Sequence, residues 1–203
     1  MYRLLCLLAL LTAAGLMGCA SQRGLTPPPD LQAHQQQLQA VASWQIDGKL
    51  GIRSPQESGS ATLKWQQQPD NYQIYLSGPL GQKRLQIIGA PAAVTLLQSG
   101  QPPMHAQSAE SLIKKAAGWT LPVSQLSYWV RGLPAPKTPI TGLQLSPQGL
   151  ISELQQANWT IHYSNYRDYY HGETRLALPG KIQAEYRDLR LTLVIRDWQL
   201  GIH

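Results

Sequence analysis

Cysteine is scarce in this chain of 203 residues: only Cys6 and Cys19 are present, both within the first twenty positions. A disulfide framework or a cysteine-based zinc site further along the chain is therefore excluded. Phenylalanine is absent, and charged residues make up only 14% of the chain, whereas apolar residues make up 43%. This balance is typical of a folded protein with a core and excludes a disordered chain.

Runs of positive charge are also lacking, although the formal net charge is +6. The lysines and arginines are scattered, with no run longer than two, and do not form the basic stripe that follows a phosphate backbone. We therefore expect no nucleic-acid partner. The excess of positive charge is suited instead to an anionic lipid surface or to the acidic rim of a partner protein.

Motifs for catalysis or metal binding are few. The histidines have no HExxH or HxH spacing, so we expect neither a metal nor another cofactor. Ser111 and Lys114 match the Ser-x-x-Lys of penicillin-interacting enzymes, but no Ser-Asp-Asn or Lys-Thr-Gly follows them. We therefore expect a protein that is not an enzyme, and a cell-wall hydrolase remains the weaker alternative. The five histidines are His34, His105, His162, His171 and His203.

The N-terminus carries an export signal. Arg3 precedes an apolar run over 4–17 that is too short to span a bilayer comfortably, which predicts a signal peptide over 1–18. The run ends in Leu-Met-Gly-Cys, which resembles the bacterial lipobox and makes Cys19 the predicted lipid attachment site. An ordinary secretory signal with an incidental cysteine is the alternative. Ala20, where an aspartate would retain a lipoprotein at the inner membrane, implies the outer membrane.

Residues 19–29 predict an acylated tether, because they are small, polar and rich in proline. Residues 30–203 then predict a single domain, since nothing within them has the composition of a linker. Asp30 can cap a short glutamine-rich helix. The positions expected to lie on its apolar face are Leu31, Leu38, Val41 and Ala42.

From Trp44 onward apolar and polar residues alternate with a period of two, which predicts strand after strand. Short connections containing glycine, proline or asparagine favour an antiparallel meander. The alternation stops between Ser108 and Arg131, where the spacing predicts two helices, the second beginning at Pro122 and ending at Gly132. Strands then resume, with a polar loop expected over 165–175.

The sequence therefore predicts a mainly β fold of the α+β class, with about ten antiparallel strands and a few helices. A single sheet of that length must curl, and helices at its mouth can then enclose an apolar cavity. Six tryptophans could wall such a cavity, although tryptophans on strands can equally belong to an ordinary core. A turn over 78–81 places Leu80 near a hairpin tip, where its apolar side chain could enter a membrane interface.

These features together resemble the LolB family of outer-membrane lipoprotein receptors of Gram-negative bacteria, and the resemblance covers the whole chain. Each motif is weak by itself, but their order and spacing are specific. The motifs are the lipobox ending at Cys19, Gly48-Lys49-Leu50, Trp65-Gln66-Gln67, Gly78-Pro79-Leu80-Gly81, Leu121-Pro122, Tyr128-Trp129, Arg131-Gly132-Leu133-Pro134, Trp159-x-Ile161-x-Tyr163, Leu178-Pro179 and the last strand to Trp198.

The resemblance implies an incomplete antiparallel β-barrel, closed by helices, whose apolar cavity shields acyl chains. It implies that triacylated lipoproteins are received from the periplasmic carrier LolA and released into the phospholipid of the outer membrane, without a nucleotide. It makes Cys19 the acylation site and Leu80 the membrane-contacting residue, and we expect Trp65, Trp129 and Trp159 in the cavity wall. A structural envelope lipoprotein with a filled core is the principal alternative.

Overall fold

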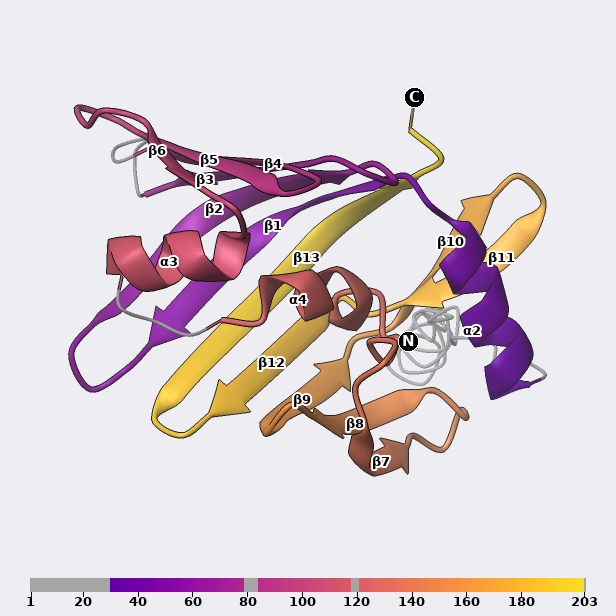
Figure 1. Ribbon diagram of the computed structural model, residues 1–203. Helices are drawn as coiled ribbons and strands as arrows, with labels where there is room; N and C mark the ends of the chain where they lie inside the picture. Colours follow the sequence, from indigo (N-terminus) through magenta and orange to yellow (C-terminus); the bar gives the residue numbers. More distant parts are fainter. Residues whose placement is uncertain (1–29, 79–83, 118–120, 203) are drawn as a thin grey trace, which may run out of the picture.

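The computed structural model describes residues 30–78, 84–117 and 121–202, which form one large antiparallel sheet, a separate two-stranded hairpin and helices (Figure 1). The elements in chain order are α2 (Leu31–Ala40), β1 (Trp44–Arg53), β2 (Ser58–Gln67), β3 (Tyr72–Ser77), β4 (Leu85–Ala90), β5 (Ala93–Gln98), β6 (Met104–Ala106), α3 (Ala109–Ala117), α4 (Val123–Trp129), β7 (Ile140–Leu145), β8 (Ile151–Gln156), β9 (Trp159–Ser164), β10 (Arg167–His171), β11 (Thr174–Leu178), β12 (Lys181–Tyr186) and β13 (Leu189–Leu200).

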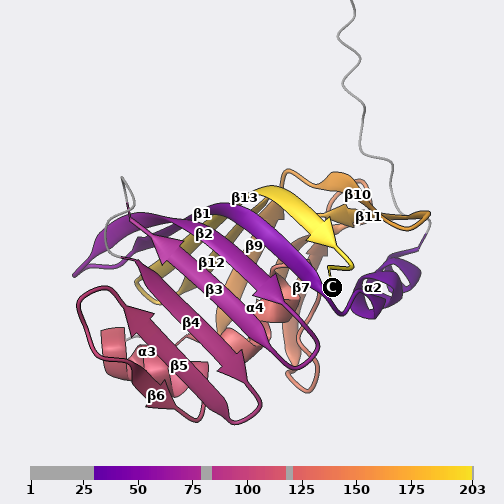
Figure 2. The ribbon, with the colours of Figure 1, turned by 90° about the horizontal axis from the view of Figure 1, so that it is seen from above.

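The large sheet has eleven strands in the order β6-β5-β4-β3-β2-β1-β13-β12-β9-β8-β7, close to the ten or so that the alternation predicts. The first and last strands, β1 and β13, pair along their full length at its centre (Figure 2). Within the described residues β6 and β7 are the two edges and do not pair, so the sheet is open rather than a closed barrel. The expectation of an incomplete barrel is therefore confirmed.

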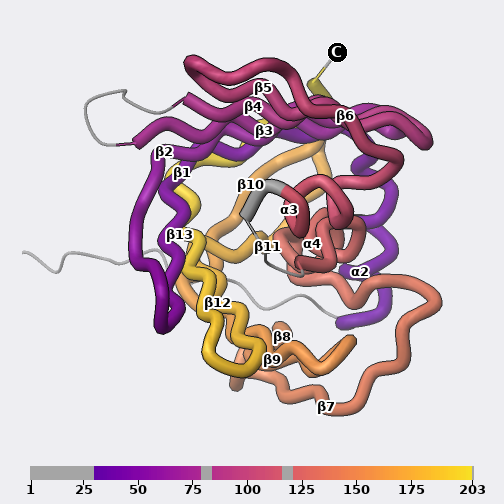
Figure 3. The backbone as a smooth tube through the Cα atoms, turned by 60° about the vertical axis from the view of Figure 1, so that its left-hand side comes forward, coloured from indigo at the N-terminus to yellow at the C-terminus, as the bar shows by residue number. Residues whose placement is uncertain are grey.

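The sheet curves, and the two helices between β6 and β7 lie on its concave side. Figure 1 shows α3 below the β2–β6 half of the sheet and α4 in front of β12 and β13, and Figure 3 shows both helices on the inner side of the curve. Both helices lie where the break in alternation predicts them, although α4 ends at Trp129 rather than at Gly132. The concave face is thus covered partly by helices, and this arrangement creates the interior space described below.

Gly48 allows β1 and β13 to approach closely. A β-bulge shifts the register between Asp47 and Gly48, and a Cβ atom at Gly48 would lie 2.3 Å from the backbone oxygen of Val194. No side chain fits at that distance, so glycine is required where the two halves of the sheet join. Because glycine has no Cβ atom, β1 and β13 can pair at this point.

Helix α2 begins as the sequence predicts. Both carboxylate oxygens of Asp30 accept backbone hydrogen bonds, from Gln32 at 3.2 Å and from Ala33 at 3.1 Å. Leu38 is buried as expected, but Ala42 is exposed. The expectation for Ala42 is wrong because the helix ends at Ala40, so the helical spacing no longer sets the direction of later side chains.

The expected polar loop over 165–175 is wrong as well, because β10 and β11 form a hairpin there. Its polar residues hide the strand pattern, since the hairpin buries side chains mainly along β11, where Leu176, Ala177 and Leu178 pack under α2 and the large sheet. Three consecutive buried residues do not alternate, so a search for alternation misses this strand.

Several positions of interest lie outside the described residues: the leader over 1–18, the tether over 19–29 with Cys19, and Leu80. Their boundaries and roles stay predictions. No helix among the described residues is long and apolar enough to cross a membrane.

Candidate functional site

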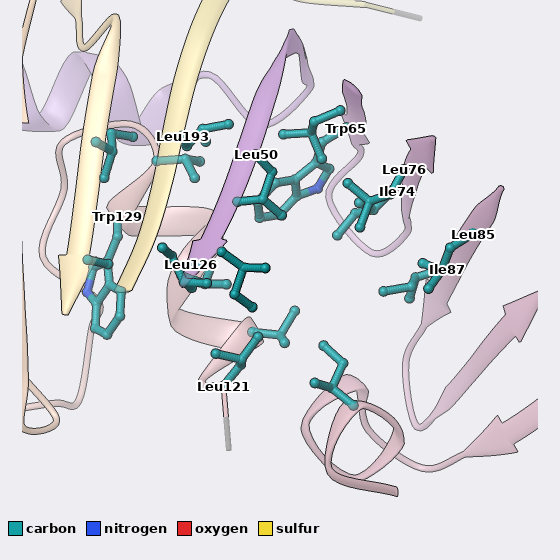
Figure 4. Close-up of a pocket in the computed structure, with 18 of the residues that line it drawn as sticks. Leu50, Trp65, Ile74, Leu76, Leu85, Ile87, Leu121, Leu126, Trp129 and Leu193 are labelled. Carbon is teal, nitrogen blue, oxygen red and sulfur yellow. The ribbon is translucent and has the colours of Figure 1, made fainter. Parts of the chain in front are cut away.

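A cavity of about 220 Å³ lies between the concave face of the sheet and helices α3 and α4 (Figure 4). Every residue that lines it is apolar, so the described wall offers no charge and no side-chain hydroxyl, carboxylate or amide. The lining residues are Leu50, Ile52, Leu63, Trp65, Ile74, Leu76, Leu85, Ile87, Leu96, Leu112, Ile113, Leu121, Val123, Leu126, Trp129, Val130, Ile161, Ile182, Ala184, Leu191 and Leu193. This space is not consistent with the alternative of a structural envelope lipoprotein that has a filled core.

The helical side of the cavity follows directly from the sequence spacing. Val123, Leu126 and Val130 recur at intervals of three and four residues, so they share the face of α4 and its last turn that points at the sheet. From the opposite side, inward-facing residues of eight strands, from β5 across to β9, complete the wall. The cavity therefore depends on helix and strand periodicities that meet across the interior.

Trp65 lies in the cavity wall and is only 5% exposed. Its ring packs against that of Trp44, with centroids 5.2 Å apart, and Trp44 in turn lies 5.5 Å from Trp198. These three rings come from β2, β1 and β13, so their packing connects the three strands at the centre of the sheet. Trp65 is the member of the cluster that reaches the empty space.

Trp129 also lies in the wall, and a buried glutamine holds it there. Its Nε1 donates to Oε1 of Gln156 at 2.9 Å. The same Oε1 accepts from the backbone nitrogen of Ala135 at 2.8 Å, while Nε2 of Gln156 donates to the backbone oxygens of Ala135 at 3.1 Å and Thr138 at 2.8 Å. Gln156 is fully buried with its amide fully paired, and it fixes both the indole and the chain after α4.

Trp159, expected in the wall, does not line the cavity. Its ring lies 6.3 Å from that of Trp129 and stacks on Tyr186 at 5.4 Å. It packs behind the wall and supports Trp129 from the far side. Sequence alternation places Trp159 on the inward face of its strand, but only the neighbouring side chains decide which inward residues reach the space.

Arg131 is a buried cation that the sequence reasoning did not single out, although its motif contributes to the family resemblance. Its guanidinium donates to the backbone oxygens of Leu38 at 3.1 Å and Val41 at 3.2 Å, and its Nε donates to that of Ser127 at 3.0 Å. It also lies over the ring of Tyr128, 5.4 Å from the centroid. Burial lowers the pKa of Arg131. Through its three hydrogen bonds the side chain anchors the end of α2 to α4.

The Ser-x-x-Lys pair lies outside the cavity lining. Ser111 and Lys114 are both exposed on α3, and the hydroxyl of Ser111 donates to the backbone oxygen of Ser108 at 2.9 Å. Among the described residues, no group of three or more histidine, cysteine, aspartate or glutamate side chains could hold a metal ion.

The open sheet wrapped around an apolar cavity defines the fold class of the protein, which is similar to that of solved LolA superfamily structures. The structure resembles that of a LolA superfamily protein from Nitrosomonas europaea, with a TM-score of 0.52, 9% sequence identity and coverage of 89% of this chain and 96% of that one. A putative outer membrane lipoprotein-sorting protein domain from Vibrio parahaemolyticus has a TM-score of 0.51 at 9% identity, over 84% of this chain and 93% of that one.

Sequence comparison assigns the family within that class. The family model of the outer membrane lipoprotein LolB matches residues 42–198, and this chain belongs to the LolB family. Relatives named outer-membrane lipoprotein LolB from Pseudomonas syringae and Pseudomonas aeruginosa are each 42% identical over 194 residues. The alignments cover 95% and 94% of this chain and 92% of each relative.

Proposed function

We propose that this protein receives lipoproteins by enclosing their acyl chains in the apolar cavity and inserts them into the outer membrane. The observation that carries this function is the lining of the cavity, which consists of apolar residues throughout. Such a wall suits a ligand that is itself hydrocarbon. The family membership of the chain supports the same function.

The energetics favour an enclosed route. Each methylene that leaves water for an apolar environment gains about 0.8 kcal/mol, so an acyl chain of about a dozen methylenes gains on the order of 10 kcal/mol. A free lipoprotein would forfeit that energy for each of its chains while it crossed an aqueous space. The cavity removes the penalty by accepting the chains before they meet water.

The cavity must widen when it is loaded. Its volume of about 220 Å³ is smaller than the roughly 300–1,000 Å³ typical of pockets for small ligands, and several acyl chains need more room than one small ligand. Helices α3 and α4 cover the cavity with apolar side chains such as Leu112 and Leu126, which can slide without breaking hydrogen bonds of their own. We therefore expect α3 and the first turn of α4 to move away from the sheet as the chains enter, while Gln156 keeps the Trp129 end of α4 in place.

The family resemblance supplies the remaining roles in our proposal, those of LolA, Cys19 and Leu80. LolA supplies the cargo, and transfer proceeds because the receptor cavity binds the chains more tightly than the carrier does. Acyl groups on Cys19 hold the receptor at the periplasmic face of the outer membrane. Leu80 enters the phospholipid interface, where full burial of its side chain contributes about 1.5–3 kcal/mol.

A transfer assay tests the proposed function. The protein carrying Cys19→Ala is mixed with LolA that holds a radiolabelled lipoprotein, and the label on each protein is counted after separation. The expected result is near-stoichiometric movement of label to the receptor. Leu126→Asp, which puts a carboxylate into the apolar wall, abolishes the transfer, whereas an exposed control, Lys114→Asp, does not. Absence of transfer to the folded protein would refute the function.

A further inference from the structure

The cavity wall contains a single unpaired buried side-chain polar atom among the described residues. Across all the described residues, three buried side-chain polar atoms lack a hydrogen-bond partner, namely Nε1 of Trp65, Oε1 of Gln125 and the hydroxyl of Tyr163. Of these three residues only Trp65 lines the cavity. A buried N–H without an acceptor destabilises the folded protein, so its retention at the wall calls for a functional reason.

The contrast with Trp129 makes this donor specific. Both indoles lie in the same wall, but the Trp129 nitrogen turns away from the cavity toward Gln156 and is satisfied at 2.9 Å. The Trp65 ring is held against Trp44, and Figure 4 shows its nitrogen on the side of the ring toward Ile74 and Leu76, two other lining residues. The Trp65 N–H therefore has no partner in the described structure, and because neighbouring side chains cover it, a ligand reaches it only as the cavity widens.

Trp65 also lies at a boundary between apolar and polar space. It lines a second recess of about 280 Å³ whose other residues include Gln67, Asp70, Tyr72 and Glu110. Burial and the nearby carboxylate of Glu110 raise the pKa of Tyr72 to about 12, so its hydroxyl keeps its proton. An acyl lipid has the same division, since its hydrocarbon ends at a carbonyl group and its polar part begins there.

We infer that the indole N–H of Trp65 donates a hydrogen bond to the ester carbonyl oxygen of an acyl chain and so sets how deep the chain enters the cavity. This inference rests on the proposed function and adds a point of polar recognition to it. On an ester-linked acyl chain the carbonyl oxygen is the strongest acceptor for this bond, stronger than the oxygen of an ether. Lipoproteins and phospholipids both carry such esters, and the test separates them.

The experiment uses the Cys19→Ala protein, which carries no acyl ester of its own, in nanodiscs of dialkyl ether phospholipid, which contribute no ester carbonyl. The probes are a diacylglyceryl-cysteine peptide and a diacyl phospholipid, each beside its dialkyl ether counterpart. Indole N–H signals are recorded by ¹⁵N NMR, and Trp65→Phe identifies the Trp65 signal. We expect the ester probe to move the Trp65 proton downfield and the ether probe to leave it, while the Trp129 signal stays in place with both.

Binding affinity supplies a second readout. We expect the protein to prefer the ester over the ether probe by about fivefold, the ratio that corresponds to one hydrogen bond of about 1 kcal/mol. Trp65→Phe abolishes this preference. Ile74→Val, which removes one methylene from the same wall, weakens both probes equally and keeps it.

The outcomes separate the inference from the function. A shift with the cysteine probe alone assigns the carbonyl to the lipoprotein, and a shift with both probes assigns it to acyl esters in general; both support the inference. Equal binding of ester and ether, with a stationary Trp65 signal, overturns the inference and leaves the function standing. In that case the N–H points at the ring of Trp44. Failure of every probe to bind overturns the proposed function as well.

Discussion

Replacing Gln156 by leucine tests whether one buried amide holds the cavity wall in place. The substitution keeps an apolar side chain of similar size but deprives four groups of their partner: the Trp129 indole, the N–H and C=O of Ala135, and the C=O of Thr138. Thr138 is only half-buried, so its carbonyl can find water. The other three groups belong to the buried residues Trp129 and Ala135, so water cannot replace their lost partner.

Three orphaned groups at the lower end of the usual cost, about 1 kcal/mol each, give a loss of about 3 kcal/mol in the free energy of unfolding. That is a large part of the 5–15 kcal/mol typical of a domain. With a urea dependence of about 2 kcal/mol per molar, the unfolding midpoint falls by about 1.5 M. Urea titration followed by tryptophan fluorescence measures it.

Gln155 provides the matched control, because it is the next residue on β8 and only half-buried, with one side-chain bond to Glu153 at 2.8 Å. Gln155→Leu lowers the midpoint by no more than about 0.3 M, as expected for a residue at the surface. If Gln156→Leu shifts the midpoint no further than this control, the hydrogen-bonded amide does not hold the wall and the reasoning fails.

Three other substitutions probe the tip, the buried cation and the buried histidine. Leu80→Glu leaves transfer from LolA intact but lowers incorporation of lipoprotein into liposomes severalfold, because a carboxylate resists the apolar interface. Arg131→Met lowers the free energy of unfolding by about 2–3 kcal/mol, because three backbone oxygens lose a charged donor; urea unfolding measures it. The wild type loses stability on acidification because of His34, and His34→Gln removes this loss. The urea midpoint of unfolding, compared between pH 7.5 and pH 5, measures it.

The sign of the His34 effect follows from its burial, which lowers its pKa below the ordinary 6.5; the charge of Arg175 adds to this, while the Ala177 hydrogen bond and the charge of Asp168 oppose it. The unfolded chain takes up a proton first as the pH falls below 6.5, so stability drops from there toward the folded pKa and is constant above. Glutamine retains an N–H donor for the backbone oxygen of Ala177, which neutral His34 reaches from Nε2 at 3.1 Å.

Each of these predictions has a result that would contradict it. Normal liposome incorporation by the Leu80 variant would remove the tip from the delivery step. Arg131→Lys keeps the charge but cannot span three carbonyls, so stability equal to wild type in both Arg131 variants would show that the anchor is dispensable. The same acid sensitivity in wild type and His34→Gln would place the titrating group elsewhere.

The sequence by itself determined the elements of this protein wherever one face of an element is buried along its whole length. Trp44, Ile46 and their neighbours alternate because β1 is buried on its concave side, and the spacing of Val123 and Leu126 predicts the cavity-facing side of α4. Asp30 likewise predicts the start of α2, because helix capping involves residues only two or three positions apart. The family resemblance drew on the same local motifs.

Tertiary structure alone decided what depends on contacts between distant residues. The pairing of β1 with β13 joins strands from opposite ends of the described chain, and Gly48 matters only because Val194 lies against it. Strand alternation and helical spacing placed Trp65, Trp129 and Trp159 on inward faces equally, yet the first lines the cavity with an unpaired N–H, the second lines it with a paired one, and the third lies behind the wall. Periodicity fixes the direction of a side chain, whereas its neighbours in space fix what it touches.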